Sequence, residues 1–267
     1  MKKQFKLGVI GCGAMARTIL RGVVLSDLLN EKKIAVSDVS EDKFESVKEL
    51  GVKTFTDNRY VAENSEFLIL AVKKEHINSV LTEISSVATD KIISVVSNVT
   101  KNVIKNAFGL KVVKVARCVP NFPCSIGSGI IGIDMFDFNH NLDDTEFITN
   151  VFSCMGTILS ADESKLDAIQ TLNSASPILT FRFIDALVDA GEALGLSRNS
   201  AKLLAVQSVF GAAEMVGREE QTLDELIVEV CKQDGAGLSV IKNTEKSDFD
   251  AKVKEAVDAY LAKYKEL

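Results

Sequence analysis

The sequence predicts an α/β fold in its first part, with a parallel sheet covered by helices on both faces, followed by an all-helical second part. Short β-branched runs alternate with helical patterns up to about residue 160, which is the rhythm of βαβ units. Continuous apolar runs such as FLILAV are typical of strands buried on both faces. Beyond that point strand signals vanish and apolar residues recur at helical spacing. We therefore expect two domains, residues 1–161 and 162–267.

The predicted elements follow from these patterns in chain order. A long helical pattern runs from Ser164 to Leu196, and Pro177 inside it is expected to kink or divide the helix near residues 173–176. More helices follow to the C-terminus, with VCKQDGAG (230–237) as an interruption between two of them. The strands of the first domain are expected at 6–10, 33–37, 52–55, 67–72, 91–96, 111–117 and 129–134.

Composition excludes several classes of function. The net charge of −6 and the scattered lysines argue against a nucleic-acid partner, which requires clustered Lys and Arg. No apolar run is long enough for a membrane span, so we expect no membrane partner. Five dispersed cysteines and only two histidines predict reduced thiols, no metal site and a cytoplasmic location.

The strongest chemical signal is GVIGCGAMA, where Gly11, Gly13 and Ala16 follow a strand and open a helix. In a Rossmann fold the first glycine makes a tight turn, and the second lets the backbone approach a pyrophosphate. The third small residue keeps helix and strand close. The alternative is a purely structural glycine turn in another α/β protein. The strand, spacing and helix together favour dinucleotide binding.

The end of the second strand bears on the choice of dinucleotide. Asp38 stands where a carboxylate accepts hydrogen bonds from the adenosine ribose, which favours NAD, and no Arg follows to clamp a 2′-phosphate. Ser37 can hydrogen-bond either form, and Asp38 is also placed to cap the next helix. The choice between NADH and NADPH stays open at this point.

Several stretches resemble the pyrroline-5-carboxylate reductase family over essentially the whole chain. They are GCGAMA, the DN of FTDNRY, LAVK, RCVPNFPCSIGSGI, FIDALVDAGEALGLSRNSA and QSVFGAAEM. The resemblance implies a Rossmann domain followed by an all-helical dimerisation domain, and a homodimer or higher homo-oligomer. It also implies NADPH- or NADH-dependent reduction of a cyclic imino acid, 1-pyrroline-5-carboxylate, to L-proline in the cytoplasm.

The resemblance also assigns roles to cofactor-site residues. Lys73 has an alternative as a solvated loop lysine, and Asn121, expected beside the reacting groups, lies in a Pro-Asn-x-Pro loop that any sharp turn could use. Val39 is a position where many relatives carry a basic residue. The expected cofactor-binding set is Ile10, Gly11, Cys12, Gly13, Ala14, Met15, Ser37, Asp38, Val39, Asn58, Ala71, Val72 and Lys73.

The expected substrate site departs from the family pattern. Relatives carry something like TSPGGTT where this chain has CKQDGAG (231–237), so Gly237 stands at the position of the family's catalytic or substrate-binding Thr. Asp234 adds an acid there. The expected substrate set is Glu220, Lys232, Gly235 and Ala236. Three interpretations follow: an ordinary pyrroline-5-carboxylate reductase, a reductase of a related imine, or a catalytically impaired nucleotide-binding paralogue with a regulatory role.

Overall fold

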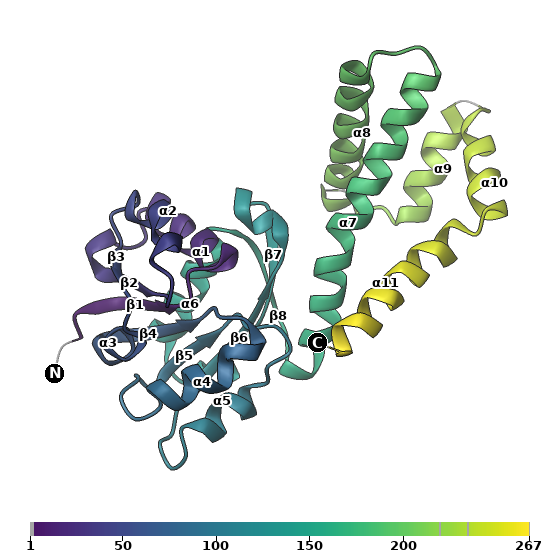
Figure 1. Cartoon of the computed structure of the whole chain (residues 1–267). Helices are drawn as coiled ribbons and strands as arrows, with labels where there is room; N and C mark the ends of the chain where they lie inside the picture. Colours follow the sequence, from purple (N-terminus) through teal and green to yellow (C-terminus); the bar gives the residue numbers. More distant parts are fainter. Residues whose placement is uncertain (1–2, 219, 234, 267) are drawn as a thin grey trace. The chain divides into compact units, whose positions relative to one another are not determined.

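The structure is a computed structural model that describes residues 3–218, 220–233 and 235–266. It divides the chain into two compact units: Met1–Asn173 together with Tyr264–Leu267, and Ser174–Lys263. The first contains the sheet and the second is helical (Figure 1). In the described residues no helix is both long and apolar enough to cross a membrane.

A single eight-stranded sheet forms the centre of the first unit, in the order β3-β2-β1-β4-β5-β6-β7-β8. All neighbouring strands are parallel except β6 and β7, which pair antiparallel with Arg117 opposite Asp134. The order reverses direction between β1 and β4, which is the switch point where such sheets bind ligands. The strands are β1 (Phe5–Ile10), β2 (Ile34–Ser37), β3 (Lys53–Phe55), β4 (Ser65–Leu70), β5 (Lys91–Ser94), β6 (Lys114–Pro120), β7 (Gly129–Asp134) and β8 (Gly156–Ser160).

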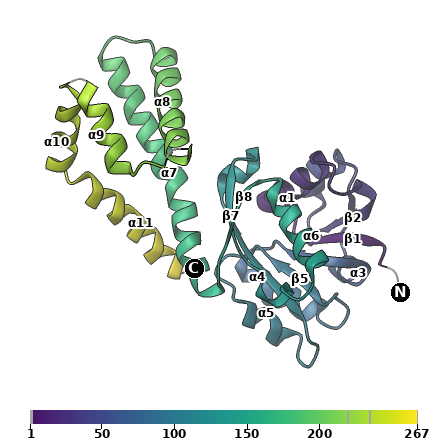
Figure 2. The same cartoon turned by 180° about the vertical axis from the view of Figure 1, so that it is seen from behind.

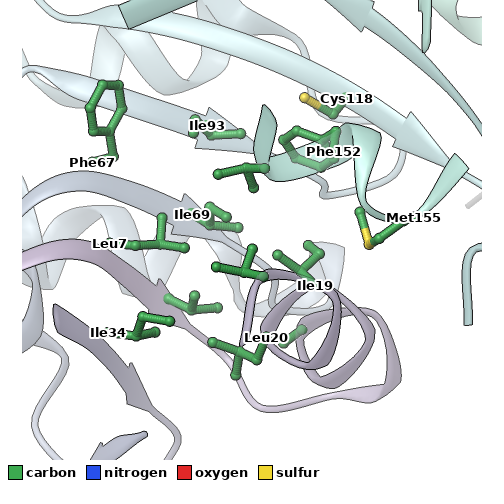
Figure 3. Packing of buried hydrophobic residues seen from close by; sticks show 14 of the residues in the cluster. Leu7, Ile19, Leu20, Ile34, Phe67, Ile69, Ile93, Cys118, Phe152 and Met155 are labelled. Carbon is green, nitrogen blue, oxygen red and sulfur yellow. The ribbon is translucent and has the colours of Figure 1, made fainter. Parts of the chain in front are cut away.

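Helices cover both faces of the sheet (Figures 1 and 2). One face packs against α1 (Ala14–Leu25), α2 (Glu45–Lys48) and α6 (Leu142–Ser153), and the other against α3 (Asn58–Asn64), α4 (Lys74–Ile84) and α5 (Lys101–Ala107). On the first face Ile19 and Leu20 of α1 pack with Ile69 of β4 and Phe152 of α6 (Figure 3). Short 3-10 turns occupy Glu31–Lys33, Glu41–Phe44, Phe122–Ile126 and Phe136–Phe138. This two-faced burial explains the continuous apolar runs of the strands.

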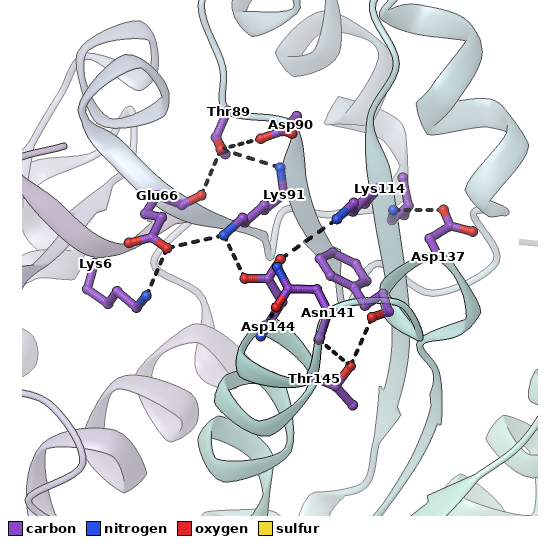
Figure 4. A network of polar contacts seen from close by, with 12 residues as sticks. Lys6, Glu66, Thr89, Asp90, Lys91, Lys114, Asp137, Asn141, Asp144 and Thr145 are labelled. Carbon is purple, nitrogen blue, oxygen red and sulfur yellow. Dashed lines mark hydrogen bonds and ion pairs between the residues drawn. The ribbon is translucent and has the colours of Figure 1, made fainter. Parts of the chain in front are cut away.

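A charged network lies where β1, β4, β5 and β6 begin (Figure 4). Lys6 contacts Glu66 at 2.8 Å, and Lys91 contacts Glu66 at 3.2 Å and Asp144 of α6 at 2.6 Å. Lys91 also lies over the ring of Phe67. The network therefore connects α6 to the amino ends of these strands. The switch-point crevice lies at their carboxyl ends.

The second unit consists of helices. They are α7 (Glu163–Ala193), which begins in the first unit, α8 (Arg198–Arg218), α9 (Leu223–Gln233), α10 (Gly237–Lys246) and α11 (Phe249–Glu266). A small core of Val188, Ala201 and Ala205 joins α7 to α8. The predicted interruption at 230–237 is confirmed in outline, since α9 ends at Gln233 and α10 begins at Gly237.

The predicted α/β class with a helical C-terminal part is confirmed, and several details differ. The strand predicted at 111–117 runs from Lys114 to Pro120, because pairing with β7 carries it up to the proline. Strand β8 was not predicted; it is short, largely exposed and, as an edge strand, pairs only with β7. Pro177 does not divide α7.

The division between the two compact units falls at a different place from the predicted 161/162 domain boundary, which stays a prediction. It falls inside α7, after Asn173. The first turns of α7 lie directly on β7: a Cβ added to Gly132 would come within 2.7 Å of Ile169 and 3.4 Å of Leu166. These turns therefore belong to the sheet unit. The division lies four residues before Pro177, at the carbonyl that a helical proline leaves without its usual donor.

Candidate functional site

A cavity of about 510 Å³ opens at the carboxyl ends of β1, β2 and β4. This is the switch-point crevice that the strand order predicts. Nine residues of the expected cofactor set line it: Ile10, Gly11, Gly13, Asp38, Val39, Asn58, Ala71, Val72 and Lys73. Six further lining residues were not predicted: Arg17, Lys43, His76, Ser79, Val80 and Glu83.

The glycine loop forms a cradle in this cavity. Gly11 has φ +95°, which L side chains rarely adopt, and its N–H donates to the Ser37 carbonyl at 2.7 Å. A Cβ at Gly11 would come within 2.6 Å of the Ala71 carbonyl oxygen. Gly13 differs, because a Cβ there would meet no atom within 4 Å. The backbone at Gly13 thus opens onto free space at the start of α1, as a bound pyrophosphate requires.

Asp38 is enclosed by donors from the protein itself. Its Oδ2 accepts from the Cys12 N–H at 2.8 Å, and its Oδ1 accepts from the Ser40 N–H at 3.0 Å. The Lys43 ammonium lies 3.0 Å from Oδ1 and 3.1 Å from Oδ2. Burial acts to raise the pKa of Asp38, but the hydrogen bonds from Cys12, Lys43 and Ser40 outweigh it and hold that pKa below its usual value. The carboxylate therefore locks the glycine loop to the end of β2.

A second set of polar contacts, formed by three side chains in a row, lies along one wall of the cavity. The Ser37 hydroxyl donates to Asn58 Oδ1 at 2.8 Å, and the Asn58 amide donates to Glu83 at 2.9 Å. Ser37 is fully buried, so it braces Asn58 rather than lining the cavity. The orientation of the Asn58 side chain is thereby fixed from two sides.

The remaining members of the expected cofactor set lie beside the cavity without lining it. Cys12 is fully buried, and burial raises the pKa of its thiol, so its contribution to the loop is the backbone N–H given to Asp38. Ala14 is exposed at the start of α1. Met15 packs partly buried against the core of the sheet.

Lys73 and Asn121 occupy contrasting environments. The side chain of Lys73 is 79% exposed and lies 3.8 Å from Glu75, at the start of α4. Asn121 is buried, and its side-chain oxygen accepts from the Ile130 N–H of β7 at 3.0 Å. That bond fixes the turn between β6 and β7, and a role for Asn121 toward a substrate stays a prediction.

The expected substrate residues lie in the second unit. Gly237 is the first residue of α10 and lines an apolar cavity of about 520 Å³ with residues such as Met215, Leu226 and Cys231. Glu220, Gly235 and Ala236 are exposed. The side chain of Lys232 and the whole of Asp234 lie outside the described residues. Gly237 thus lies at the N-terminus of α10, and a substrate-binding role for this loop stays a prediction.

The lining residues that sequence reasoning missed carried a weak signal. Arg17 follows Gly13 by one helical turn, and its guanidinium donates to the Cys12 carbonyl at 3.2 Å. Lys43 lies in the short 3-10 turn Glu41–Phe44, and its ammonium group contacts the Asp38 carboxylate. Spacing alone could have placed Arg17 beside the loop, whereas the contact of Lys43 depends on the tertiary path of the chain. Among the residues described, no cluster of three His, Cys, Asp or Glu is arranged to hold a metal ion.

Comparison with known proteins gives two family matches. Residues 163–267 match a family described as pyrroline-5-carboxylate reductase dimerisation. Residues 6–98 match one described as NADP oxidoreductase coenzyme F420-dependent. The first covers the helical part of the chain, and the second contains the glycine loop, Asp38 and Lys73.

Individual relatives match over nearly the full chain. A pyrroline-5-carboxylate reductase from Arabidopsis thaliana is 32% identical over 99% of this chain and 96% of its own length. One from Methanosarcina acetivorans is 30% identical over 98% of this chain and 97% of its own.

Solved structures give the same result. The pyrroline-5-carboxylate reductase of Coxiella burnetii has a TM-score of 0.86 and 29% identity, covering 98% of both chains. The pyrroline carboxylate reductase of Plasmodium falciparum, solved with NADP bound, also has a TM-score of 0.86, with 25% identity, and the match covers 100% of this chain and 99% of that one.

Proposed function

The chain belongs to the pyrroline-5-carboxylate reductase family, and from this premise we propose that it reduces 1-pyrroline-5-carboxylate to L-proline with NAD(P)H. The observation that carries the proposal is the glycine loop at the switch point. The backbone at Gly13 faces the cavity, and Gly11 makes a tight turn with a positive φ that other residues rarely adopt. These residues fit a dinucleotide.

The proposed chemistry asks for positioning more than for acid or base groups. When bound, NAD(P)H supplies a hydride to the C=N bond of the imine. Because the cyclic imine is already protonated, the protein's task is to hold the two reactants face to face and to exclude water. In this proposal the loop from Gly11 to Met15 holds the pyrophosphate, Asn58 is kept in place by Ser37 and Glu83, and Val72 with Lys73 lines the cofactor further along.

The substrate carboxylate is assigned to the start of α10. The N-terminus of a helix carries partial positive charge and attracts anions. Gly237 opens this helix where relatives place a hydroxyl residue, so the interaction proposed here lacks one side-chain donor. Each missing charge-assisted hydrogen bond costs about 1.5–3 kcal/mol, so the Michaelis constant for the imino acid should be raised relative to a loop that carries the hydroxyl.

The paired variants Gly237→Thr and Gly237→Ala test this assignment. A Cβ at Gly237 comes within 3.2 Å of Cys231 in either variant, and Thr adds a hydroxyl and a methyl group to that Cβ. We expect Gly237→Thr to lower the KM for 1-pyrroline-5-carboxylate by about tenfold and Gly237→Ala to leave it unchanged or raise it. Equal KM values for the two variants would contradict the proposal that the substrate carboxylate binds at this loop.

A second candidate substrate is a related imine with an uncharged substituent. The observation in its favour is the lining of the cavity at Gly237, which is almost entirely aliphatic on α8, α9 and α10. Steady-state kinetics with a panel of cyclic imines, with and without a ring carboxylate, separates the two candidates. A higher kcat/KM for the imines without a carboxylate would favour the second.

The matched dimerisation region supports homo-oligomerisation, and we propose a homodimer as the smallest assembly. Many large apolar side chains of the helical unit are exposed, which is typical of surfaces buried by association. They include Phe181, Leu203, Leu204, Phe210, Leu223, Val230 and Val240. We also propose a cytoplasmic location, since the cysteines are dispersed as in chains kept reduced.

A further inference from the structure

The adenosine end of the cofactor cavity holds a carboxylate that has no vacant acceptor position. Each oxygen of Asp38 receives two donors, one backbone N–H and the Lys43 ammonium. A carboxylate oxygen accepts about two hydrogen bonds. Asp38 therefore has nothing left with which to bind a ribose hydroxyl, which is the usual task of an acid at the end of the second strand.

Lys43 is a polar group with a donor still available at this end. Its ammonium carries three N–H donors, of which the two contacts with Asp38 occupy at most two. The side chain is 45% exposed and lines the cavity, whereas the side chain of Asp38 is 7% exposed. Val39, 85% exposed beside them, has no polar side-chain atom. A ligand group at the end of β2 thus meets a cation rather than an acid.

The charge of the lining supports the same conclusion. Its cations are Arg17, Lys43 and Lys73, and its carboxylates are Asp38 and Glu83, so three positive charges face two negative ones. Glu83 is engaged by the Asn58 amide, and Asp38 by Lys43. In a dinucleotide-binding fold the 2′ position of the adenosine ribose lies at the end of the second strand.

We propose that Lys43 makes this chain select NADPH over NADH by binding the 2′-phosphate of the adenosine ribose, while Asp38 holds the ammonium in place. The inference rests on the proposed use of NAD(P)H. It assigns the selection to a lysine five residues beyond the usual acidic position, held there by the acid itself.

Equilibrium binding to the full chain tests the proposal without any imine. The probes are NADPH and NADH, and the adenosine fragments adenosine 2′,5′-bisphosphate and adenosine 5′-monophosphate, titrated by calorimetry. We expect the native chain to bind the 2′-phosphorylated member of each pair about tenfold or more tightly, as one charge-assisted hydrogen bond implies. In Lys43→Gln that preference should fall to roughly twofold or less, because NADPH loses its contact and the oxygens of Asp38 become available to the ribose of NADH.

Two further variants serve as controls. Lys43→Arg keeps the cation and should keep a preference for NADPH. Lys53→Gln removes an exposed lysine of β3 that does not line the cavity, and its affinities should equal those of the native chain. The proposal is overturned if Lys43→Gln weakens NADPH and NADH by the same factor, or if the native chain binds NADH as tightly as NADPH.

These measurements are independent of the proposed reaction. If the chain binds NADPH selectively through Lys43 but reduces no imine, the reaction is wrong and the inference stands. If it reduces 1-pyrroline-5-carboxylate equally well with both cofactors and binds them equally, the reaction stands and the inference fails.

Discussion

At the scale of single residues, the two glycines of the loop have different tasks. Gly11 is required by the backbone, because its φ of +95° and the nearby Ala71 carbonyl leave no place for a side chain. Gly13 is not required by the backbone, because a Cβ there would meet no atom within 4 Å, so we attribute its place in the motif to the proposed dinucleotide. One motif thus combines a folding constraint with a binding constraint.

The substitutions Gly11→Ala and Gly13→Ala should separate these constraints. Gly11→Ala should lower the free energy of unfolding by about 2 kcal/mol or more through backbone strain and the clash. Gly13→Ala should lower the free energy of unfolding by no more than about 1 kcal/mol, because a Cβ at Gly13 meets no atom within 4 Å and only the poorer preference of Ala for an N-cap remains as a cost. It should nevertheless weaken NADPH binding about tenfold or more. Denaturant unfolding and cofactor titration measure the two effects. Equal stability of both variants would contradict this division of roles.

Sequence reasoning reached part of this site and missed part of it. Gly11, Gly13 and Val72 follow strands whose apolar pattern is visible in the sequence, so their meeting at one sheet edge was predictable. The saturation of Asp38 was not, because it depends on how the loop at Cys12 and the turn at Lys43 approach the same carboxylate.

At the scale of elements, the charged network at the start of β1, β4 and β5 contributes to the stability of the fold, and this contribution depends on pH. Burial acts to raise the pKa of Glu66, but hydrogen bonds from Lys6 and Lys91 outweigh it and hold the pKa below its usual value. A carboxyl group with a lowered pKa stabilises the fold above its unfolded pKa, about 4.3, and loses that contribution as the pH falls through its folded pKa.

Glu66→Gln should therefore be less stable than the native chain at pH 7, by no more than about 1 kcal/mol because the pair is partly exposed. The difference should shrink as the pH falls through the lowered pKa of the folded Glu66, where the native carboxyl also becomes neutral. The control is Glu63→Gln, an exposed acid that forms no ion pair within the described part of the chain. Unfolding curves measured across this pH range check the prediction, and a difference that persists or grows in acid would contradict it.

The elements that sequence reasoning misplaced share a physical cause. Strand β8 has no two-sided burial to give it an apolar signature, and its existence depends on pairing with β7. Pro177 predicts a break by local chemistry, yet α7 continues on both sides of it. In each case tertiary contacts decide, and a single-sequence pattern does not contain them.

At the scale of the whole molecule, the end of the chain belongs to the unit that contains its beginning. Tyr264 is 5% exposed, and its hydroxyl accepts from the Asn98 N–H at 3.0 Å, in the loop after β5. Asn98 has φ +57°, so a residue in the left-handed region is held by the C-terminal tyrosine. The hydroxyl also lies 3.4 Å from Asp167 of α7.

Removing this hydroxyl should destabilise the first unit. Tyr264→Phe keeps the buried ring and leaves the Asn98 N–H without its acceptor, so we expect a loss of about 1 kcal/mol. Tyr260→Phe, one turn earlier on α11, provides a matched substitution on the same helix. Native-state hydrogen exchange should show faster exchange at the amide of Asn98 in Tyr264→Phe, and an unchanged rate there would contradict the assignment.

The most direct test of the proposed reaction is product formation by the full chain. Purified protein is incubated with 1-pyrroline-5-carboxylate and either NADPH or NADH, and L-proline is quantified against the cofactor oxidised. The proposed function predicts one L-proline for each cofactor consumed, whichever of the two cofactors is used. Tight cofactor binding without L-proline, together with turnover of an imine that lacks the carboxylate or with no turnover at all, would contradict it.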